Sequence, residues 1–425
     1  MTVPRRARLA VTVLFAVNGA AFAAVVPLYP QLQSAEHVSA AGWGAALSGY
    51  PVGTLLTGPA AGWVVRRWGS APALCAGIAA LAVLNAAFVV AGDLAWLVAV
   101  FLLLGCLDAV IEVAANVQAL QVQHRYGRSL LHTCHAAWSV GAITGGVLGA
   151  GAAGAALPLR GYLPAVAAAV VAVVVGCRRF LLPERPPRPG PGPTAAAATA
   201  VGRSDVELVA SRPVGLVAAA GLVAACGTFI EDVPASWGAI YLTELGATAA
   251  VAGAAVVAAQ TAMAAGRAGG DWLTGRYGPR TVVRGGAVLA AAATGVALAV
   301  PAPAITLAAF AVCGLAVAGT IPAAMTRAAT VPGQPVAPAV TAVSMMQRGG
   351  PLLAPLLIGF IGEHAGLCAA LLTVPVVAVT LWAAAGSLAG RPPRSHPAAA
   401  SAAPDPAGTP PAEAQHPVPP IEGRR

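Results

Sequence analysis

The chain has 425 residues, of which 58% are hydrophobic and 9% are charged. Ordinary soluble domains carry about 25% charged residues, so this composition excludes an ordinary soluble globular protein and indicates a chain that lies mostly in lipid. The formal net charge is +9, yet no stretch interleaves arginines with aromatic residues, so no nucleic-acid partner is expected.

Twelve apolar segments follow one another along the chain, each near the roughly 20 residues that a helix needs to cross the hydrocarbon. Backbone groups in lipid must be satisfied within the segment, which predicts α-helices. We therefore expect an all-α integral membrane protein with twelve transmembrane helices. The predicted spans are 9–30, 41–65, 73–91, 94–118, 133–156, 162–182, 214–242, 247–265, 282–300, 303–326, 336–360 and 366–388.

The arginines are distributed unevenly between the two sets of connections. If the N-terminus is cytoplasmic, the opposite set holds only Arg160, and this positive-inside bias predicts a multi-pass protein of the cell membrane with both termini in the cytoplasm. An alternative interpretation makes Ala21-Phe22-Ala23 a signal-peptide cleavage site, but the apolar run continues past it and cleavage would leave eleven spans. The arginine-rich set contains Arg5, Arg6, Arg8, Arg66, Arg67, Arg125, Arg128, the cluster in 178–212, Arg276, Arg280, Arg284, Arg327 and the arginines of the tail.

Two stretches differ from the apolar segments in composition. Residues 183–213 are rich in proline and charge, which predicts a flexible cytoplasmic linker, and residues 389–425 are proline-rich with little that could pack, which predicts a disordered cytoplasmic tail. The expected organisation is an N-terminal six-helix half in 1–182 and a C-terminal six-helix half in 214–388.

The two halves carry a matching motif of the form W-x-x-x-R-aromatic-G. It ends at Gly69 in the first half and at Gly278 in the second, an offset of 278 minus 69, or 209. The same offset carries the start of span 4 to the start of span 10. This internal duplication predicts two pseudo-symmetric six-helix halves around a central site, as in secondary transporters.

The sequence resembles the major facilitator superfamily over residues 5 to 390. Gly62-Trp-Val-Val-Arg66-Arg67-Trp-Gly69 stands where that superfamily carries its loop signature between spans 2 and 3. A branch of bacterial permeases related to the fucose-proton symporters is similar at the segments Glu112-Val-Ala-Ala-Asn116-Val-Gln118, His124-Arg-Tyr-Gly-Arg128, His135-Ala-Ala-Trp138-Ser-Val-Gly141 and Gly266-Arg267-Ala-Gly-Gly270-Asp271.

The sequence departs from the superfamily pattern at the signature loops. The resemblance implies an acid there that pairs with neighbouring helix ends on the cytoplasmic side and favours the outward-facing state, but this chain has Arg66 and Gly275 instead. We expect that state to be held less firmly unless Asp271 takes over the contact. The residues assigned to gating loops are Gly62, Arg66, Arg67, Gly69, Arg267, Asp271, Arg276 and Gly278, with Arg267 and Asp271 expected to pair with each other or with the next loop.

Span 4 contains a stripe of polar side chains. Asp108, Glu112 and Asn116 are spaced i, i+4, i+8, which places them within an arc of roughly 80° on one helix face. Ionisable side chains inside a span usually face the bundle interior or a water-filled cavity, and the resemblance implies that spans 1, 4, 7 and 10 line one. The stripe is a predicted substrate or proton pathway, with Glu112 as the carrier of the coupling proton; the alternative is that it only ties span 4 to a neighbouring helix.

Span 7 contains two adjacent acids, Glu231 and Asp232, followed by Pro234. Adjacent residues point about 100° apart, so at most one acid can face the cavity squarely. Proline frees backbone carbonyls and can break the helix where a substrate lies. The alternative is that these acids are hydrated at the outer mouth of the span.

Four further residues complete the predicted pathway. Asn18 stands in span 1 where the fucose symporters have an acid, so their two-carboxylate proton pathway is not carried over. His135 in span 5 is a candidate, with a structural histidine as the alternative. Trp237 could stack on a sugar ring or belong to an interfacial belt, and Arg348 in span 11 could oppose the buried acids or snorkel to one end.

These observations predict a proton-coupled secondary transporter of a sugar-like solute or a small drug or metabolite, working by alternating access as a monomer. No cofactor, metal or catalytic residue is expected, since no Walker loop, metal-ligand spacing or nucleophile with a base stands in the sequence. The alternatives are an intramembrane prenyl transferase or hydrolase, and a non-coupled pore or receptor. Uptake and export remain open.

Overall fold

The computed structural model describes residues 3–90, 92–126, 130–182, 211–332 and 334–388, and in this part of the chain all regular structure is helical. The predicted linker lies outside the described residues except for its last three, which begin a helix, and the predicted tail lies outside them entirely.

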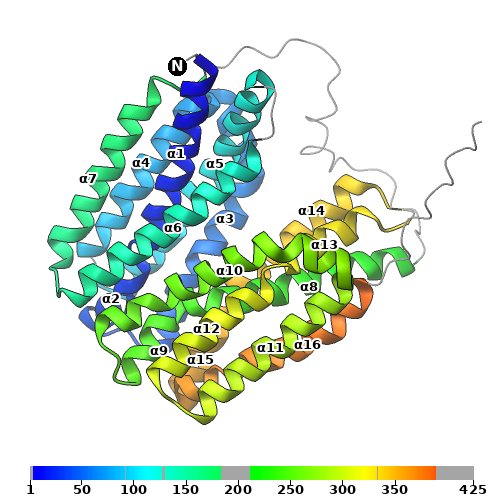
Figure 1. Ribbon diagram of the computed structural model, residues 1–425. Coiled ribbons are helices and arrows are strands. Elements are labelled where there is room, and N and C mark those ends of the chain that lie inside the picture. The colour runs from blue at the N-terminus through cyan, green and yellow to red at the C-terminus, as the bar shows by residue number, and fades with distance from the viewer. Residues whose placement is uncertain (1–2, 91, 127–129, 183–210, 333, 389–425) are drawn as a thin grey trace, which may run out of the picture. The chain divides into compact units, whose positions relative to one another are not determined.

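The first half consists of the helices α1 to α7 (Figure 1). Their bounds are α1 Val3–Ala23, η1 Val26–Leu28, α2 Tyr29–Ala35, α3 Ala40–Trp68, α4 Ser70–Ala86, η2 Ala87–Val90, α5 Leu94–Tyr126, α6 Leu131–Gly154 and α7 Leu159–Arg178.

The second half consists of the helices α8 to α16, drawn from green to orange in Figure 1. Their bounds are α8 Ser211–Ser236, α9 Gly238–Glu244, α10 Ala249–Tyr277, α11 Pro279–Ala299, α12 Pro303–Val317, α13 Thr320–Ala329, α14 Val336–Gln347, α15 Gly349–Ala370, α16 Thr373–Ala384 and η3 Ala385–Leu388.

Among the described residues, ten helical stretches are long and apolar enough to cross a membrane. The two other predicted spans are helical as well. One is α3, a continuous helix of sufficient length whose apolar sequence is interrupted by polar residues, glycines and two prolines. The other is the shorter apolar stretch Thr373–Leu388. The result is the twelve-helix, two-half architecture that the sequence predicts.

Two helices extend beyond their predicted spans at the same end of the molecule. The predicted spans stopped at residues 65 and 265, but α3 continues to Trp68 and α10 to Tyr277. Arginine continues a helix well, and both helices end only where Gly69 and Gly278 adopt φ values of 89° and 79°, a conformation that glycine reaches without penalty. Residues assigned to loops therefore stand on the last turns of two helices.

The internal duplication is visible in the bounds of the helices. An offset of 209 residues converts the bounds of α2 into those of α9 and the bounds of α3 into those of α10. The side chains of Ser39 and Thr248 cap these two long helices in the same way, each accepting a hydrogen bond from the third backbone N–H that follows. Equivalent positions thus perform equivalent structural roles.

The halves differ in two helices that are continuous in the first and interrupted in the second. Helix α5 is unbroken over 33 residues, whereas its counterpart is divided into α12 and α13. Helix α6 is unbroken, whereas its counterpart is divided into α14 and α15 at Arg348. At that break the Thr228 hydroxyl donates a hydrogen bond of 2.6 Å to the Gln347 carbonyl, which satisfies an oxygen at the end of α14.

The two most extensive contacts between the halves are formed by α3 with α15 and by α6 with α10. Both use small residues, which let backbones approach closely in lipid: a Cβ at Gly44 would overlap the Pro355 carbonyl, and one at Gly154 would lie 2.7 Å from the Ala250 Cβ. These contacts lie near the beginnings of α3 and α10. We call this the Ser39 end of the molecule, and the opposite end, where Gly69 and Gly278 stand, the Gly69 end.

Candidate functional site

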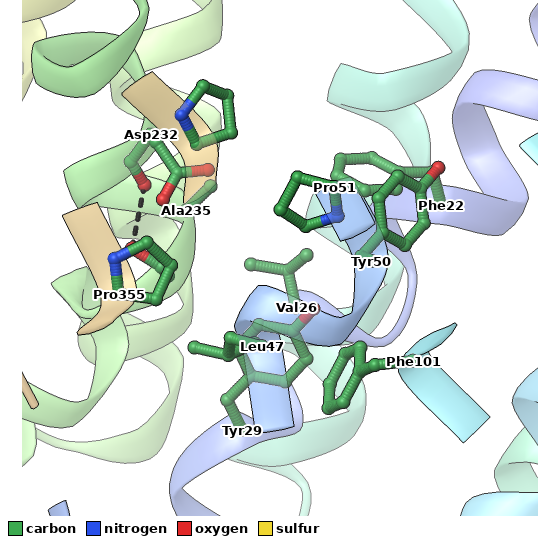
Figure 2. Close-up of a pocket in the computed structure, with 12 residues that line it drawn as sticks. Phe22, Val26, Tyr29, Leu47, Tyr50, Pro51, Phe101, Asp232, Ala235 and Pro355 are labelled. Carbon is green, nitrogen blue, oxygen red and sulfur yellow. Dashed lines mark hydrogen bonds between the residues drawn. The ribbon is translucent and has the colours of Figure 1, made fainter. Parts of the chain in front are cut away.

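A cavity of about 210 Å³ lies between the two halves. It is smaller than the roughly 300–1,000 Å³ of most ligand pockets, so it suits a small solute. Figure 2 shows its aromatic side chains on the first half, facing Asp232 on the second. Its 12 lining residues are Phe22, Val26, Tyr29, Leu47, Tyr50, Pro51, Phe101, Asp232, Ala235, Ser236, Pro351 and Pro355.

Asp232 brings a carboxyl group to this cavity from the last turns of α8. Its Oδ2 atom is buried and has no hydrogen-bond partner among the described residues. The Ser236 hydroxyl donates to the Asp232 backbone carbonyl at 3.0 Å, so one polar group of the lining is already engaged. The predicted span 214–242 is divided three residues after Pro234: α8 ends at Ser236, and the separate helix α9 begins at Gly238.

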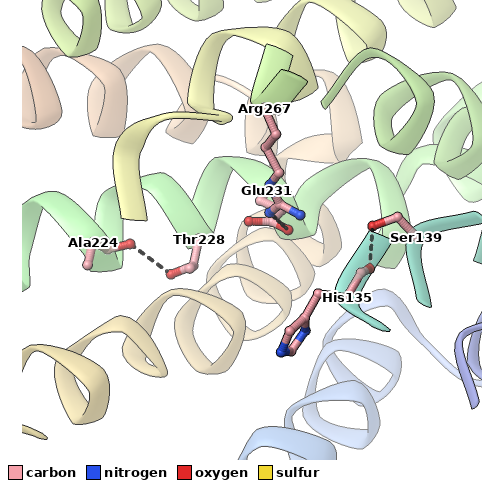
Figure 3. Close-up of polar contacts among 6 residues, drawn as sticks. All are labelled: His135, Ser139, Ala224, Thr228, Glu231 and Arg267. Carbon is pink, nitrogen blue, oxygen red and sulfur yellow. Dashed lines mark hydrogen bonds and ion pairs between the residues drawn. The ribbon is translucent and has the colours of Figure 1, made fainter. Parts of the chain in front are cut away.

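Glu231, the adjacent acid, points elsewhere, as the 100° rotation between neighbours requires. Its Oε1 lies 3.6 Å from Nη2 of Arg267 on α10, and its side chain is 25% exposed (Figure 3). The predicted pairing of Arg267 with Asp271 is therefore wrong for this structure: Arg267 reaches back across the bundle to α8, and Asp271 is exposed further along α10.

The polar stripe of α5 is present, but its three members have different environments. The Tyr50 hydroxyl contacts the Asp108 carboxyl. Glu112 is half exposed, and its Oε2 accepts a hydrogen bond of 3.2 Å from Nη2 of Arg348. The Oδ1 of Asn116 is buried without a hydrogen-bond partner among the described residues. Only the first of these contacts connects the stripe to the lining of the cavity.

The ion pair of Glu112 and Arg348 joins the two halves. Arg348 stands at the break between α14 and α15, with 26% of its side chain exposed. The expectation that this cation opposes an acid of span 4 agrees with this geometry, since the guanidinium contacts the carboxylate rather than extending away from it.

Three other predicted pathway residues lie outside the cavity lining. Trp237 is fully buried and lies against Gly359 of α15, so in this conformation it belongs neither to an interfacial belt nor to a ring-stacking surface. His135 is exposed on α6, with its ring 5.4 Å from that of Phe15. Asn18 on α1 has a buried Oδ1 without a hydrogen-bond partner among the described residues.

The residues assigned to gating occupy the Gly69 end. Arg66 and Arg67 are exposed in the last turn of α3, and a Cβ at Gly62 would lie 3.4 Å from Nη1 of Arg66. At the equivalent end of α10, the Arg276 guanidinium lies 5.7 Å from the centroid of the Tyr277 ring.

Sequence reasoning missed the aromatic wall of the cavity, which consists of Phe22, Tyr29, Tyr50 and Phe101. A signal was available, because aromatic residues make up only 5% of the chain and all four of these stand inside predicted spans. Among the described residues, no group of three or more His, Cys, Asp or Glu side chains is placed to hold a metal ion.

Comparisons with known proteins agree with this architecture. The model of the Major Facilitator Superfamily matches residues 11–326 and 217–420. An uncharacterised MFS-type transporter from Yersinia pestis is 25% identical over 377 residues, which cover 87% of this chain and 93% of that protein.

Two solved structures share the fold. The nucleoside transporter NupG superimposes with a TM-score of 0.71 at 13% identity, covering 90% of this chain and 99% of that one. The Escherichia coli fucose:proton symporter FucP gives a TM-score of 0.56 at 18% identity, covering 90% and 98%. With two six-helix halves, a cavity between them and the family model matched over most of its length, the chain belongs to the major facilitator superfamily of membrane transporters.

Proposed function

We propose that this protein is a proton-coupled secondary transporter that moves a small organic solute through the cavity between its halves. Two acids at membrane depth, Asp108 and Asp232, lie at or next to that cavity, and such groups usually mark substrate or proton pathways. A fucose:proton symporter among the proteins of the same fold adds support for the coupling ion.

The observation that carries the proposal is the position of Tyr50. Its ring lines the cavity, and its hydroxyl contacts the carboxyl of Asp108 on the polar stripe. An ionised Asp108 carboxylate can only accept a hydrogen bond from the Tyr50 hydroxyl, whereas a protonated Asp108 carboxyl group can also donate one. A solute that contacts the Tyr50 ring and a proton that binds Asp108 therefore both act on the Tyr50 side chain. Each can in this way change the binding free energy of the other, which is what coupling requires.

The arginine asymmetry supports placing the Gly69 end in the cytoplasm. The halves contact each other near the Ser39 end, and at the Gly69 end a Cβ at Gly58, Gly269 or Gly270 would have no neighbour within 4 Å. With that orientation the conformation is closed toward the outside, and alternating access proceeds by rocking the halves about the cavity.

The test is transport by the purified protein in proteoliposomes with an imposed pH gradient, screening sugars, nucleosides and small organic cations and anions. Coupling to one proton gives a steady-state solute ratio of up to about tenfold for each pH unit, because both correspond to about 1.4 kcal/mol. A ratio of one for every transported solute would refute proton coupling and leave a facilitator.

Tyr50→Phe tests the connection itself. It keeps the ring in the cavity and removes the hydroxyl that contacts Asp108. A polar contact of this kind contributes up to about 0.5–1.5 kcal/mol, so we expect coupling to weaken roughly two- to tenfold while solute exchange without a gradient persists. Tyr162→Phe is the matched control, since the Tyr162 hydroxyl donates to the Ala24 carbonyl outside the cavity lining. Equal coupling in both variants would show that Tyr50 does not link solute and proton.

A further inference from the structure

We propose that the cavity selects an organic cation: a protonated amine or quaternary ammonium group carried on a small apolar body. This inference rests on the proposed transport function only for its biological consequence, because it concerns binding. It narrows the solute from any small organic molecule to one charge class.

The first support is the charge balance of the lining. Asp232 is the acid among the 12 lining residues, and no arginine or histidine stands with it. Two arginines of the second half are engaged with other acids, Arg267 with Glu231 and Arg348 with Glu112. The Asp232 carboxylate therefore faces the cavity without a cationic partner, and its buried Oδ2 has no donor among the described residues. A donor on a cationic solute would satisfy it.

The second support is the wall opposite Asp232. Phe22, Tyr29, Tyr50 and Phe101 present aromatic rings, and ring faces attract cations by about 0.5–2 kcal/mol. The rings hold one another in edge-to-face pairs, with centroids 6.0 Å apart for Phe22 and Tyr50 and for Tyr29 and Phe101. An acid on one side and aromatic rings on the other make a site for a cationic head with an apolar body.

The third support is the scarcity of free hydrogen-bonding groups. The Ser236 hydroxyl is engaged with the Asp232 carbonyl and the Tyr50 hydroxyl contacts Asp108, which leaves the Tyr29 hydroxyl and the Asp232 carboxylate of the lining for a solute. A sugar buried here would leave several hydroxyl groups unpaired, each at a cost of about 1–3 kcal/mol. An anion would meet an uncompensated acid. The lining therefore disfavours both of these classes.

The experiment is calorimetric titration of the purified full-length chain in lipid nanodiscs at neutral pH, without any gradient. The probes are protonated phenethylamine, neutral phenethyl alcohol and anionic phenylacetate, which share a ring and differ in charge, together with L-fucose. We expect phenethylamine to bind at least about tenfold tighter than the alcohol, as one charge-assisted contact of about 1.5–3 kcal/mol allows, and phenylacetate and L-fucose to bind more weakly still.

Two variants locate the selectivity. Asp232→Asn is expected to remove the preference for the amine while leaving the affinity for the alcohol within about twofold, which also shows that the variant is folded. Phe22→Leu, which keeps apolar volume but removes a ring, is expected to lower amine affinity several-fold and alcohol affinity little. Glu244→Gln is the control, because Glu244 is exposed on α9 and absent from the lining.

The inference is overturned if the wild-type protein binds the amine no better than the alcohol, if L-fucose binds most tightly, or if Asp232→Asn keeps the preference. These outcomes are separable from failure of the proposed function. Selective binding of the amine without any transport driven by a proton gradient would support the cation site and refute the proposed coupling. Proton-coupled transport of a neutral solute without a preference for the amine would support the coupling and refute the cation site.

Discussion

The two adjacent acids in α8 have different surroundings, because neighbouring positions on a helix point in different directions. Glu231 pairs with Arg267, whereas Asp232 turns one carboxylate oxygen into the cavity. The sequence predicts this division, because neighbours on a helix differ by about 100°. It does not predict which acid takes which role, since that depends on the neighbouring helices.

The acids of the α5 stripe differ in the same way, and their variants identify the coupling proton. We expect Asp108→Asn to bring the steady-state solute ratio close to one in the proteoliposome assay, because Asp108 contacts the cavity through Tyr50. Glu112→Gln should retain a solute ratio set by the gradient and lower the rate by a few-fold, since a partly exposed ion pair contributes about 0–1 kcal/mol.

The sequence-based assignment of the proton to Glu112 predicts the opposite pattern. In that case Glu112→Gln keeps solute exchange but loses the gradient-driven ratio, and Asp108→Asn has the milder effect. The two variants measured side by side across a range of pH decide between the two acids.

At the scale of helices, the contact between α3 and α15 holds the Ser39 end closed. The Glu363 carboxylate of α15 accepts a hydrogen bond of 3.1 Å from the Ala41 N–H at the start of α3. The first N–H groups of a helix have no partner within the helix and attract anions. A carboxylate from one half thus completes the beginning of a long helix in the other.

We expect Glu363→Gln to weaken this contact and to shift the population toward the state that is open at the Ser39 end. Spin labels at Trp68 and Tyr277, equivalent exposed positions on the last turns of α3 and α10, report the change in a cysteine-free background. Double electron–electron resonance should show the population with short distances increase. An unchanged distance distribution would mean that the small-residue contacts alone hold this end.

The opposite end lacks the acid that the superfamily signature carries, since Arg66 occupies its position in the first half. Arg66→Asp should restore an attraction to basic groups at neighbouring helix ends and increase the same short-distance population. Asp271→Asn should act in the reverse direction if Asp271 substitutes for the missing acid. If neither variant changes the spin-label distances, closure at the Gly69 end depends on other contacts.

At the scale of the whole molecule, the arginine distribution predicts the orientation of this duplicated transporter in the membrane. Figure 1 shows α1 at the start of the first bundle and α16 near the end of the second. An even number of spans places both ends of this helical body on one side.

The topology is tested with single cysteines in a cysteine-free background. Gly190→Cys and Ala400→Cys lie in segments outside the described residues, and the arginine asymmetry predicts that both face the cytoplasm. An impermeant thiol reagent should label neither in intact cells and both after permeabilisation. Labelling of both in intact cells would show the opposite orientation, and the Gly69 end would then face the outside.

The sequence by itself determined the helices, their number and their duplication. Apolar length specifies a span because the hydrocarbon has a fixed thickness, and the 209-residue offset follows from motifs that stand in the chain. It also identified the faces of α5 and α8 that carry acids, since helical periodicity is a local property.

Only the tertiary structure decided which partner each of these residues meets. Glu112 and Arg348 are 236 positions apart in sequence, Asp108 is bound by Tyr50 of another helix, and Arg267 pairs with Glu231 rather than with Asp271, one turn away on its own helix. Periodicity gives the direction of a side chain from its own helix axis. Which helix stands in that direction is set by close packing of small residues between helices, and no local pattern in the sequence carries that information.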